Sequence, residues 1–229
     1  MNDLTITPIA YIENDFKEKF GVPRQSGRAP SVISKITFLP EYRSNDAVRG
    51  IEDFSHLWLI FDFSKCHRDG FTPLIRPPRL GGNEKVGVFA SRSPFRPNNL
   101  GLSSVKLIKV DYQDKNAPVL YVSGADLIDK TPIFDIKPYL PFSDCHNDAK
   151  GGFADQKQNH HLNVIIPPQI ASLLSEEKLQ ALKECLADDP RPSYHDDGRT
   201  YGMAYGNFNV KFDVKGDTLT VHSIEKSSN

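Results

Sequence analysis

The sequence has little cysteine, almost no net charge and no long run of apolar residues. Its three cysteines, Cys66, Cys145 and Cys185, are odd in number and far apart, which argues against a disulfide framework and favours a reducing compartment. The formal charge of −1, from 28 Lys and Arg against 29 Asp and Glu, gives no overall reason to expect a polyanionic partner. No apolar segment approaches the roughly 20 residues that a membrane span needs, and the N-terminus lacks a signal-peptide pattern. We therefore expect a cytoplasmic protein with no membrane partner.

Sequence motifs with a defined catalytic or cofactor chemistry are also missing. The chain has no GxSxG, HExxH or GxxxxGK[ST] pattern, which argues against a nucleophile elbow, a zinc-protease helix and a P-loop. No GxGxxG string follows a predicted strand, so a Rossmann-type nucleotide site is not supported. The cysteines and histidines lack the paired spacing of a structural zinc site, and we expect no metal. The pattern names no general base or other catalytic residue.

Short apolar segments dominate the first two thirds of the chain. They predict strands over residues 4–12, 33–38, 54–63, 87–91, 104–112 and 119–128, with one short helix near 46–53. Within 104–112 we expect Val105, Leu107 and Val110 to point inward. A run of strands with little helical periodicity favours a closed or nearly closed antiparallel β-barrel over a doubly wound α/β sheet. The predicted fold class is therefore mainly β.

The last third of the chain has a different pattern. Residues 143–163 are polar, contain glycine and have no periodicity, which is typical of a linker or a long excursion. A helix is expected to begin after an N-cap at Ser175 and to end at Asp189-Pro190. Its apolar stripe consists of Leu179, Leu182 and Leu186. The segments FNVKFDV and TLTVHSI, joined across KGD, predict a hairpin. The predicted division is a β-barrel domain (1–142), a linker (143–163) and a small α+β domain (164–229).

A cationic strip lies between Arg76 and Lys109. It holds seven Lys and Arg against one acid, Glu84, a local balance of +6 (7 − 1) in a nearly neutral chain. Its centre, SRSPFRPNN at 91–99, fixes two arginines between prolines, and Pro23-Arg24-Gln25 is an earlier element of the same kind. Arginine offers a planar fork of donors that suits carboxylate or phosphate, and prolines reduce the entropy lost on binding. Two interpretations stay open: a rigid anion clamp, or a solvated basic surface with turns.

Acidic groups lie at and beyond the end of the strand predicted over 119–128, at Asp126, Asp129 and Asp135. Carboxylates at a strand end bind ribose hydroxyls or cationic groups, but they also cap turns. The segment ADDPRPSY at 187–194 is a further turn, in which Tyr194 is available to stack on a base. The alternative is a simple stop for the preceding helix, and the pattern alone favours that interpretation.

Several long strings are similar to the signature of one protein family. They are FKEKFGVPRQSG, DAVRGIEDFSHLWLIF, RPPRLGGN, VFASRSPFRPNNLGLSSVKL, DIKPYLPF and DPRPSY. At matching spacing from about residue 8 to 142, and again near the C-terminus, the chain resembles the TsaA-like family, also called TrmO. This resemblance implies S-adenosylmethionine-dependent methylation of N6 of threonylcarbamoyladenosine, the modified adenosine 3′ of the anticodon in certain tRNAs. It also implies a β-barrel rather than a Rossmann fold, and a homodimer with cofactor pockets near the subunit interface.

The resemblance further implies which residues bind S-adenosyl-L-methionine. Carried over motif by motif, they are Pro23, Arg24, Gln25, Ser64, Lys65, Arg92, Leu102, Asp126, Leu127, Ile128 and Asp129. In this arrangement Arg24 or Arg92 clamps the cofactor carboxylate. Asp126 or Asp129 holds the ribose hydroxyls or complements the sulfonium, and Leu102 packs against adenine.

The cationic strip and the DPRPSY turn are the expected contacts for the anticodon stem-loop of tRNA, through phosphates and base stacking. Within SRSPFRPNN we expect Arg92 to contact the cofactor and Arg96 to serve the tRNA or the dimer partner. The alternative function is a non-catalytic RNA-binding barrel, in which the same arginines bind phosphates only. A small-molecule nucleotide hydrolase is a third hypothesis, which no nucleophile–base pair or metal cluster supports.

Overall fold

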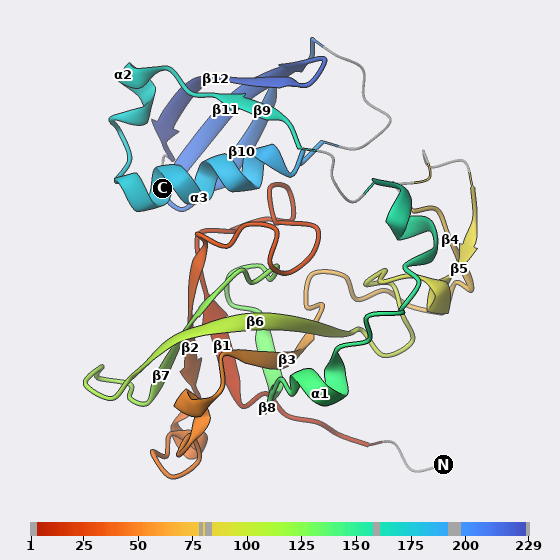
Figure 1. The fold of residues 1–229 in the computed structure, drawn as a ribbon, viewed down its shortest axis with the longest axis vertical. Coiled ribbons are helices and arrows are strands. Elements are labelled where there is room, and N and C mark those ends of the chain that lie inside the picture. The colour runs from red at the N-terminus through yellow and green to blue at the C-terminus, as the bar shows by residue number, and fades with distance from the viewer. Residues whose placement is uncertain (1–3, 78–79, 81–83, 158–160, 192–197, 228–229) are drawn as a thin grey trace.

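A β-barrel and a smaller sheet with one long helix make up the molecule (Figure 1). The computed structural model describes residues 4–77, 80, 84–157, 161–191 and 198–227. The barrel strands are β1 (Ala10–Glu13), β2 (Ile33–Phe38), β3 (His56–Asp62), β6 (Leu100–Asp111), β7 (Val119–Ser123) and β8 (Pro132–Pro138). They pair in the order β1-β2-β7-β6-β3-β8, and the pairing of β8 with β1 closes the barrel. Every pair is antiparallel, so the predicted mainly β, closed antiparallel barrel is confirmed.

The barrel interior follows from alternation along each strand. In β3, Leu57, Leu59 and Phe61 are buried, because every second side chain of a strand points to the same face. In β6, Val105 and Val110 are both buried although they are an odd number of residues apart. A register shift between Leu107 and Lys109 resolves this, because a bulge inserts one residue and restores the inward direction. The predicted inward direction of Val105 and Val110 is therefore confirmed.

Several predicted boundaries are wrong. The first strand begins at Ala10 rather than residue 4, since Pro8 has no N–H for a ladder. The strand expected over 87–91 ends at Gly87, where β5 (Val86–Gly87) gives way to the short helix η4 (Val88–Ala90). The helix near 46–53 is only the 3-10 turn η2 (Ile51–Asp53). Strand β8 was not predicted, because Pro132 and Pro138 at its ends are typical of loops.

The smaller sheet contains β10 (Tyr201–Tyr205), β11 (Phe208–Lys215), β12 (Thr218–Lys226) and β9 (Asn163–Ile165), in that order. The predicted hairpin is confirmed as β11 and β12. The remaining helices are η1 (Pro40–Tyr42), α1 (Pro141–Asp144), η5 (Gly152–Lys157), α2 (Pro168–Ala171) and α3 (Glu176–Ala187). Helix α3 begins as predicted, because the Ser175 side chain accepts a hydrogen bond from the Lys178 N–H. Leu182 and Leu186 are fully buried against the sheet, and Leu179 is half-buried.

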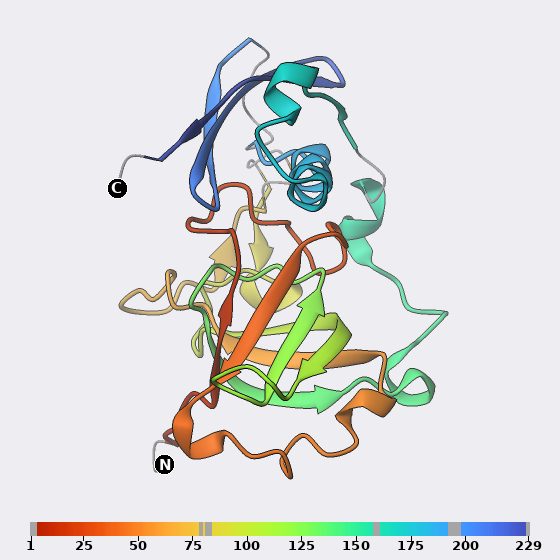
Figure 2. The same ribbon diagram turned by 90° about the vertical axis from the view of Figure 1, so that its left-hand side faces the viewer.

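One loop from the barrel, residues 14–32, lies between the two units (Figure 2). Its buried residues Phe16, Ala29 and Val32 belong to the apolar core of the smaller sheet and not to the barrel core. The backbone N–H and hydroxyl of Ser31 both donate to the Glu184 carboxylate of α3, each over 2.7 Å. The two units are therefore joined by a shared core as well as by surface contacts.

A short hairpin of β4 (Leu74–Ile75) and β5 projects beside η5 at the edge of the barrel (Figure 1). It carries part of the cationic strip away from the barrel wall. None of the helices in the described part of the chain has the length and apolar character needed to cross a membrane.

Gly101 provides a test of the barrel packing. A Cβ atom at this position would lie 2.3 Å from the ring of Phe61, which is buried and packs edge-on against Phe63. Gly101→Ala should lower the free energy of unfolding by about 1–3 kcal/mol, because the core must rearrange to admit the methyl group. Gly87→Ala is the control, since nothing lies within 4 Å of a Cβ there. Equal urea midpoints for the two variants would contradict the packing.

Candidate functional site

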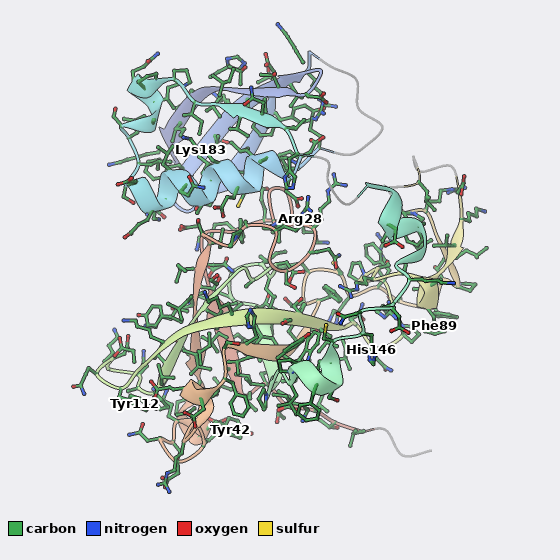
Figure 3. All side chains as sticks on the ribbon, in the orientation of Figure 1. Arg28, Tyr42, Phe89, Tyr112, His146 and Lys183 are labelled. Carbon is green, nitrogen blue, oxygen red and sulfur yellow. The ribbon has the colours of Figure 1, made fainter. Side chains whose placement is uncertain are left out.

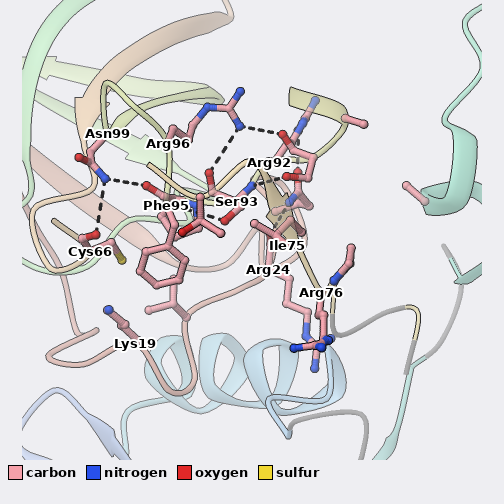
Figure 4. Close-up of a pocket in the computed structure, with 18 of the residues that line it drawn as sticks. Lys19, Arg24, Cys66, Ile75, Arg76, Arg92, Ser93, Phe95, Arg96 and Asn99 are labelled. Atoms are coloured by element: carbon pink, nitrogen blue, oxygen red, sulfur yellow. Dashed lines mark hydrogen bonds between the residues drawn. The ribbon is translucent and has the colours of Figure 1, made fainter. Parts of the chain in front are cut away.

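A cleft of about 1380 Å³ opens between the barrel loops and the end of α3 (Figure 4). Four segments supply most of its wall: residues 19–25, 66–77, 89–99 and 188–191. The segment expected to be a linker or a long excursion also contributes, through Gly151, Phe153 and Ala154. No sequence signal pointed to these three residues, because they reach the cleft only through the tertiary path of the chain.

The wall of this cleft is strongly cationic. Among the lining residues that the structure describes, the cations are Lys19, Arg24, Arg68, Arg76, Arg92, Arg96 and Arg191. The acids are Asp69 and Asp188, and Asp188 already forms an ion pair with Arg28. The guanidinium group of Arg68 stacks on the Phe95 ring at 3.6 Å from its centroid, which keeps one cation flat against an aromatic face. A concave, positively charged wall of this kind attracts anionic ligands.

The SRSPFRPNN loop is held by its own polar side chains. Arg96 donates to the carbonyl of Ser91 at 2.8 Å, and Asn99 donates to the carbonyl of Pro94 at 2.8 Å (Figure 4). These bonds fold the loop back on itself. Arg92 is exposed and donates across the cleft wall to the Gln25 side-chain oxygen at 2.6 Å. The two arginines of the motif therefore have different surroundings.

The VPRQ motif, residues 22–25, is held by the turn that follows helix α3. Pro23 is buried, and the Arg24 guanidinium donates to the carbonyls of Asp189 and Arg191, at 2.9 Å in the first case. Gln25 follows directly and receives the bond from Arg92. The structure thus brings Arg24, Gln25 and Arg92 together in one wall of the cleft.

Asp126, just after the end of β7, has one carboxylate oxygen, Oδ1, that is buried and without a hydrogen-bond partner among the described residues. Burial raises the pKa of the Asp126 carboxyl above its usual value. Hydrogen bonding to Ser103 and the positive charge of Arg92 act in the opposite direction but only in part. A buried carboxylate oxygen without a donor is costly, and a ligand hydroxyl or amine would satisfy it.

Four other predicted cofactor residues are not among those that line the cleft. Leu127 is in the barrel core, the Ile128 carbonyl accepts from Thr131, and Asp129 binds Lys17 at 2.7 Å. Leu102 is 56% exposed on the outside of β6.

Ser64 and Lys65 are exposed just after β3 and are not among the residues that line the cleft. Arg79 of the RPPRLGG string lies outside the described residues, as do Ser193 and Tyr194 of the DPRPSY turn.

A closed antiparallel barrel whose loops build a cationic cleft defines a binder of anionic ligands. Family comparison narrows this class. The model of the tRNA-methyltransferase O N-terminal domain matches residues 11–145, and the TrmO C-terminal domain matches residues 159–227. The chain belongs to the TrmO family.

Individual relatives agree over most of the chain. The tRNA (adenine(37)-N6)-methyltransferase of Escherichia coli is 39% identical over 98% of this chain and 99% of its own length. The protein of that name from Eikenella corrodens is 40% identical over 75% of this chain and 97% of its own length. The crystal structure of TrmO from Pseudomonas aeruginosa superposes with a TM-score of 0.80 at 32% identity and covers 99% of each chain.

The raised pKa of Asp126 gives a pH test on the ligand-free protein. A carboxyl whose pKa is raised by folding contributes stability below its unfolded pKa of about 4, and this contribution is lost as the pH rises through the folded pKa. Asp126→Asn should therefore raise the thermal midpoint at pH 7, and the gain should shrink towards pH 4. The exposed Asp148→Asn is the control. A midpoint at pH 7 that stays the same or falls would show that the buried charge is not destabilising.

Proposed function

We propose that this protein is an S-adenosylmethionine-dependent tRNA methyltransferase that methylates N6 of adenine 37, with threonylcarbamoyladenosine as the substrate nucleoside. The observation that carries the proposal is a cationic cleft whose lining includes Arg92 and Gln25, with the charge of Arg92 acting on the nearby Asp126 carboxyl, in a chain of the TrmO family. The relatives named as tRNA (adenine(37)-N6)-methyltransferases support the reaction.

The residues at this wall fit S-adenosylmethionine. The unpartnered Oδ1 of Asp126 suits a ribose hydroxyl, which has the donor that this buried oxygen needs. Arg92 is exposed to the cleft and suits the cofactor carboxylate, since a guanidinium binds carboxylate through two parallel bonds. Arg24 suits a fixing role in the same wall, because its guanidinium already bonds to two carbonyls. When bound, S-adenosylmethionine supplies a methyl group on a sulfonium, ready for transfer to nitrogen.

The contribution of the protein to such a transfer is alignment. Nitrogen, methyl carbon and sulfur must lie in line, so groups that hold both reactants in one orientation supply much of the rate. The SRSPFRPNN loop is suited to this because Arg96 and Asn99 fix it before any ligand binds. The prolines at positions 94 and 97 restrict it further.

The remaining cations of the cleft suit tRNA. Lys19, Arg68 and Arg76 line the same opening without belonging to the proposed cofactor wall. Arginines near an opening position nucleic acid by their contacts to phosphate. The stacked pair of Arg68 and Phe95 offers a flat surface for an unpaired base. A non-catalytic RNA-binding barrel would need these cations but not a carboxylate with a buried, unpartnered oxygen, so Asp126 favours the catalytic interpretation.

We also propose that the protein acts as a homodimer. Leu100 and Leu102 are exposed on β6, and Phe89 is 73% exposed at the barrel edge (Figure 3). Exposed apolar side chains on neighbouring elements mark a surface that another chain covers. A second copy seated there would bring Leu102, together with Ser64 and Lys65, to a cofactor wall that one chain builds only in part.

The location and the domain division complete the proposal. A cytoplasmic location fits the cysteines of the described structure, all three of which are free thiols. The barrel domain over 1–142, the linker over 143–163 and the C-terminal domain over 164–229 fit the strand positions to within one residue, since β8 ends at Pro138 and β9 begins at Asn163, the last linker residue.

Methyl transfer tests the function directly. Incubated with S-adenosylmethionine and threonylcarbamoylated tRNA, the protein should add about 14 Da to that nucleoside by mass spectrometry, the mass of CH₂ gained when CH₃ replaces H. Arg92→Ala should lower kcat/KM about 100-fold, which corresponds to about 3 kcal/mol of charged hydrogen bonding. Arg49→Ala is the matched control, because Arg49 is exposed and pairs only with its neighbour Asp46 among the contacts described. A wild-type protein that leaves the nucleoside unmodified would contradict the proposal.

The dimer is tested by a charge on its proposed surface. Leu102→Glu should convert the dimer to a monomer in light scattering, because burying a carboxylate in an apolar interface is unfavourable. Leu173→Glu is the control, since Leu173 lies beyond the barrel and is 55% exposed against 56% for Leu102. A wild-type monomer, or a Leu102→Glu variant that stays dimeric, would place the interface elsewhere or remove it.

A further inference from the structure

One buried carboxylate at the end of helix α3, Asp188, contacts the loop 14–32 of the barrel, called the cofactor loop below. One of its oxygens accepts the backbone N–H of Arg24 at 3.2 Å. The other accepts from the Arg28 side chain at 2.6 Å, and Figure 3 shows Arg28 between α3 and the barrel. Asp188 therefore connects two points of the 14–32 loop to the C-terminal unit.

The turn that follows Asp188 strengthens the same connection. Its backbone carbonyls, at Asp189 and Arg191, accept the Arg24 guanidinium. The turn has a fixed shape, because Asp189 adopts a left-handed conformation with φ 51° and its carboxylate binds Arg191 at 2.9 and 3.1 Å. Both the backbone and the side chain of Arg24 are thus held by residues 188–191.

The position of Arg24 determines the position of the next residue. The Gln25 side chain donates to the Arg24 carbonyl and accepts from Arg92, so it spans the two arginines. The backbone of Ser26, one residue further, reaches the Asp126 carboxylate. A change at Asp188 would be transmitted along three consecutive residues to the wall that we assign to the cofactor.

We infer that Asp188 is a positioning residue for cofactor binding: it belongs to the C-terminal unit and sets the cofactor loop of the barrel. This inference rests on the proposed function. It gives the C-terminal unit a role in the affinity for S-adenosylmethionine, separate from any contact with tRNA. Asp188 acts through Arg24, since its two oxygens are engaged by Arg24 and Arg28.

The test compares binding with turnover. Calorimetry with S-adenosylhomocysteine should show that Asp188→Ala raises the Kd about tenfold, as expected for loss of a hydrogen bond of about 1.4 kcal/mol. The KM for S-adenosylmethionine should rise by the same factor, while kcat and the KM for tRNA change less than about twofold. Asp188→Asn keeps an oxygen for the Arg24 N–H and should recover most of the affinity. Should the alanine variant not fold, Asp188→Ser takes its place with the same expectation, because its shorter side chain cannot span Arg24 and Arg28.

Asp213→Ala is the matched control. Asp213 is a half-buried carboxylate of the same unit that pairs with His222 at 2.9 Å, and it does not line the cleft. Its variant should bind S-adenosylhomocysteine as the wild type does. An unchanged Kd in the Asp188 variants, or an equal rise in both KM values, would overturn the inference. Failure of the wild type to bind S-adenosylhomocysteine would instead count against the proposed function.

Discussion

The sharing of one loop between two apolar cores is the constraint on which the rest of the structure depends. Residues 14–32 leave the barrel and return to it, yet Phe16, Ala29 and Val32 are buried in the core of the smaller sheet. Moving this loop would expose apolar side chains, which costs about 25 cal/mol for each Å² uncovered. The VPRQ motif is therefore fixed at its base by apolar packing before any polar contact is counted.

Polar contacts then place individual groups on this fixed base. Arg24 is held by carbonyls, and Arg92 extends from a loop that Arg96 and Asn99 keep folded. One oxygen of Asp126 is buried and has no hydrogen-bond partner among the described residues, which is unfavourable for the protein alone. Sites that bind ligands commonly retain such unfavourable groups, because the ligand completes them. In the proposed function, the cationic wall and the Asp126 carboxylate are two parts of one site.

Local pattern predicted the elements whose residues determine their own conformation. Strand β2 coincides with the predicted 33–38, and α3 begins where Ser175 can cap it, since alternation and capping are local effects. Strand β8 depends on partners from β1 and β3, and its terminal prolines concealed it. Within the site, Arg24, Gln25 and Arg92 were predicted through a resemblance and meet in the cleft. Phe153 could not be predicted, because only the tertiary path of a polar segment brings it there.

The two arginines of SRSPFRPNN show why composition alone could not resolve the site. Arg92 follows a serine and Arg96 follows a phenylalanine, and each has a proline within two residues. Composition alone therefore does not indicate which arginine binds a ligand. In the folded chain Arg96 donates hydrogen bonds to carbonyls of its own loop, whereas Arg92 donates to the Gln25 side chain. A guanidinium that satisfies backbone carbonyls stabilises a shape, whereas one at an exposed cleft wall can exchange its partner for an anion. In the proposed function, the loop therefore contains both the cation that binds the ligand and the cation that keeps the loop in position. The rigidity that Arg96 gives the loop then lowers the entropy lost when Arg92 binds an anion.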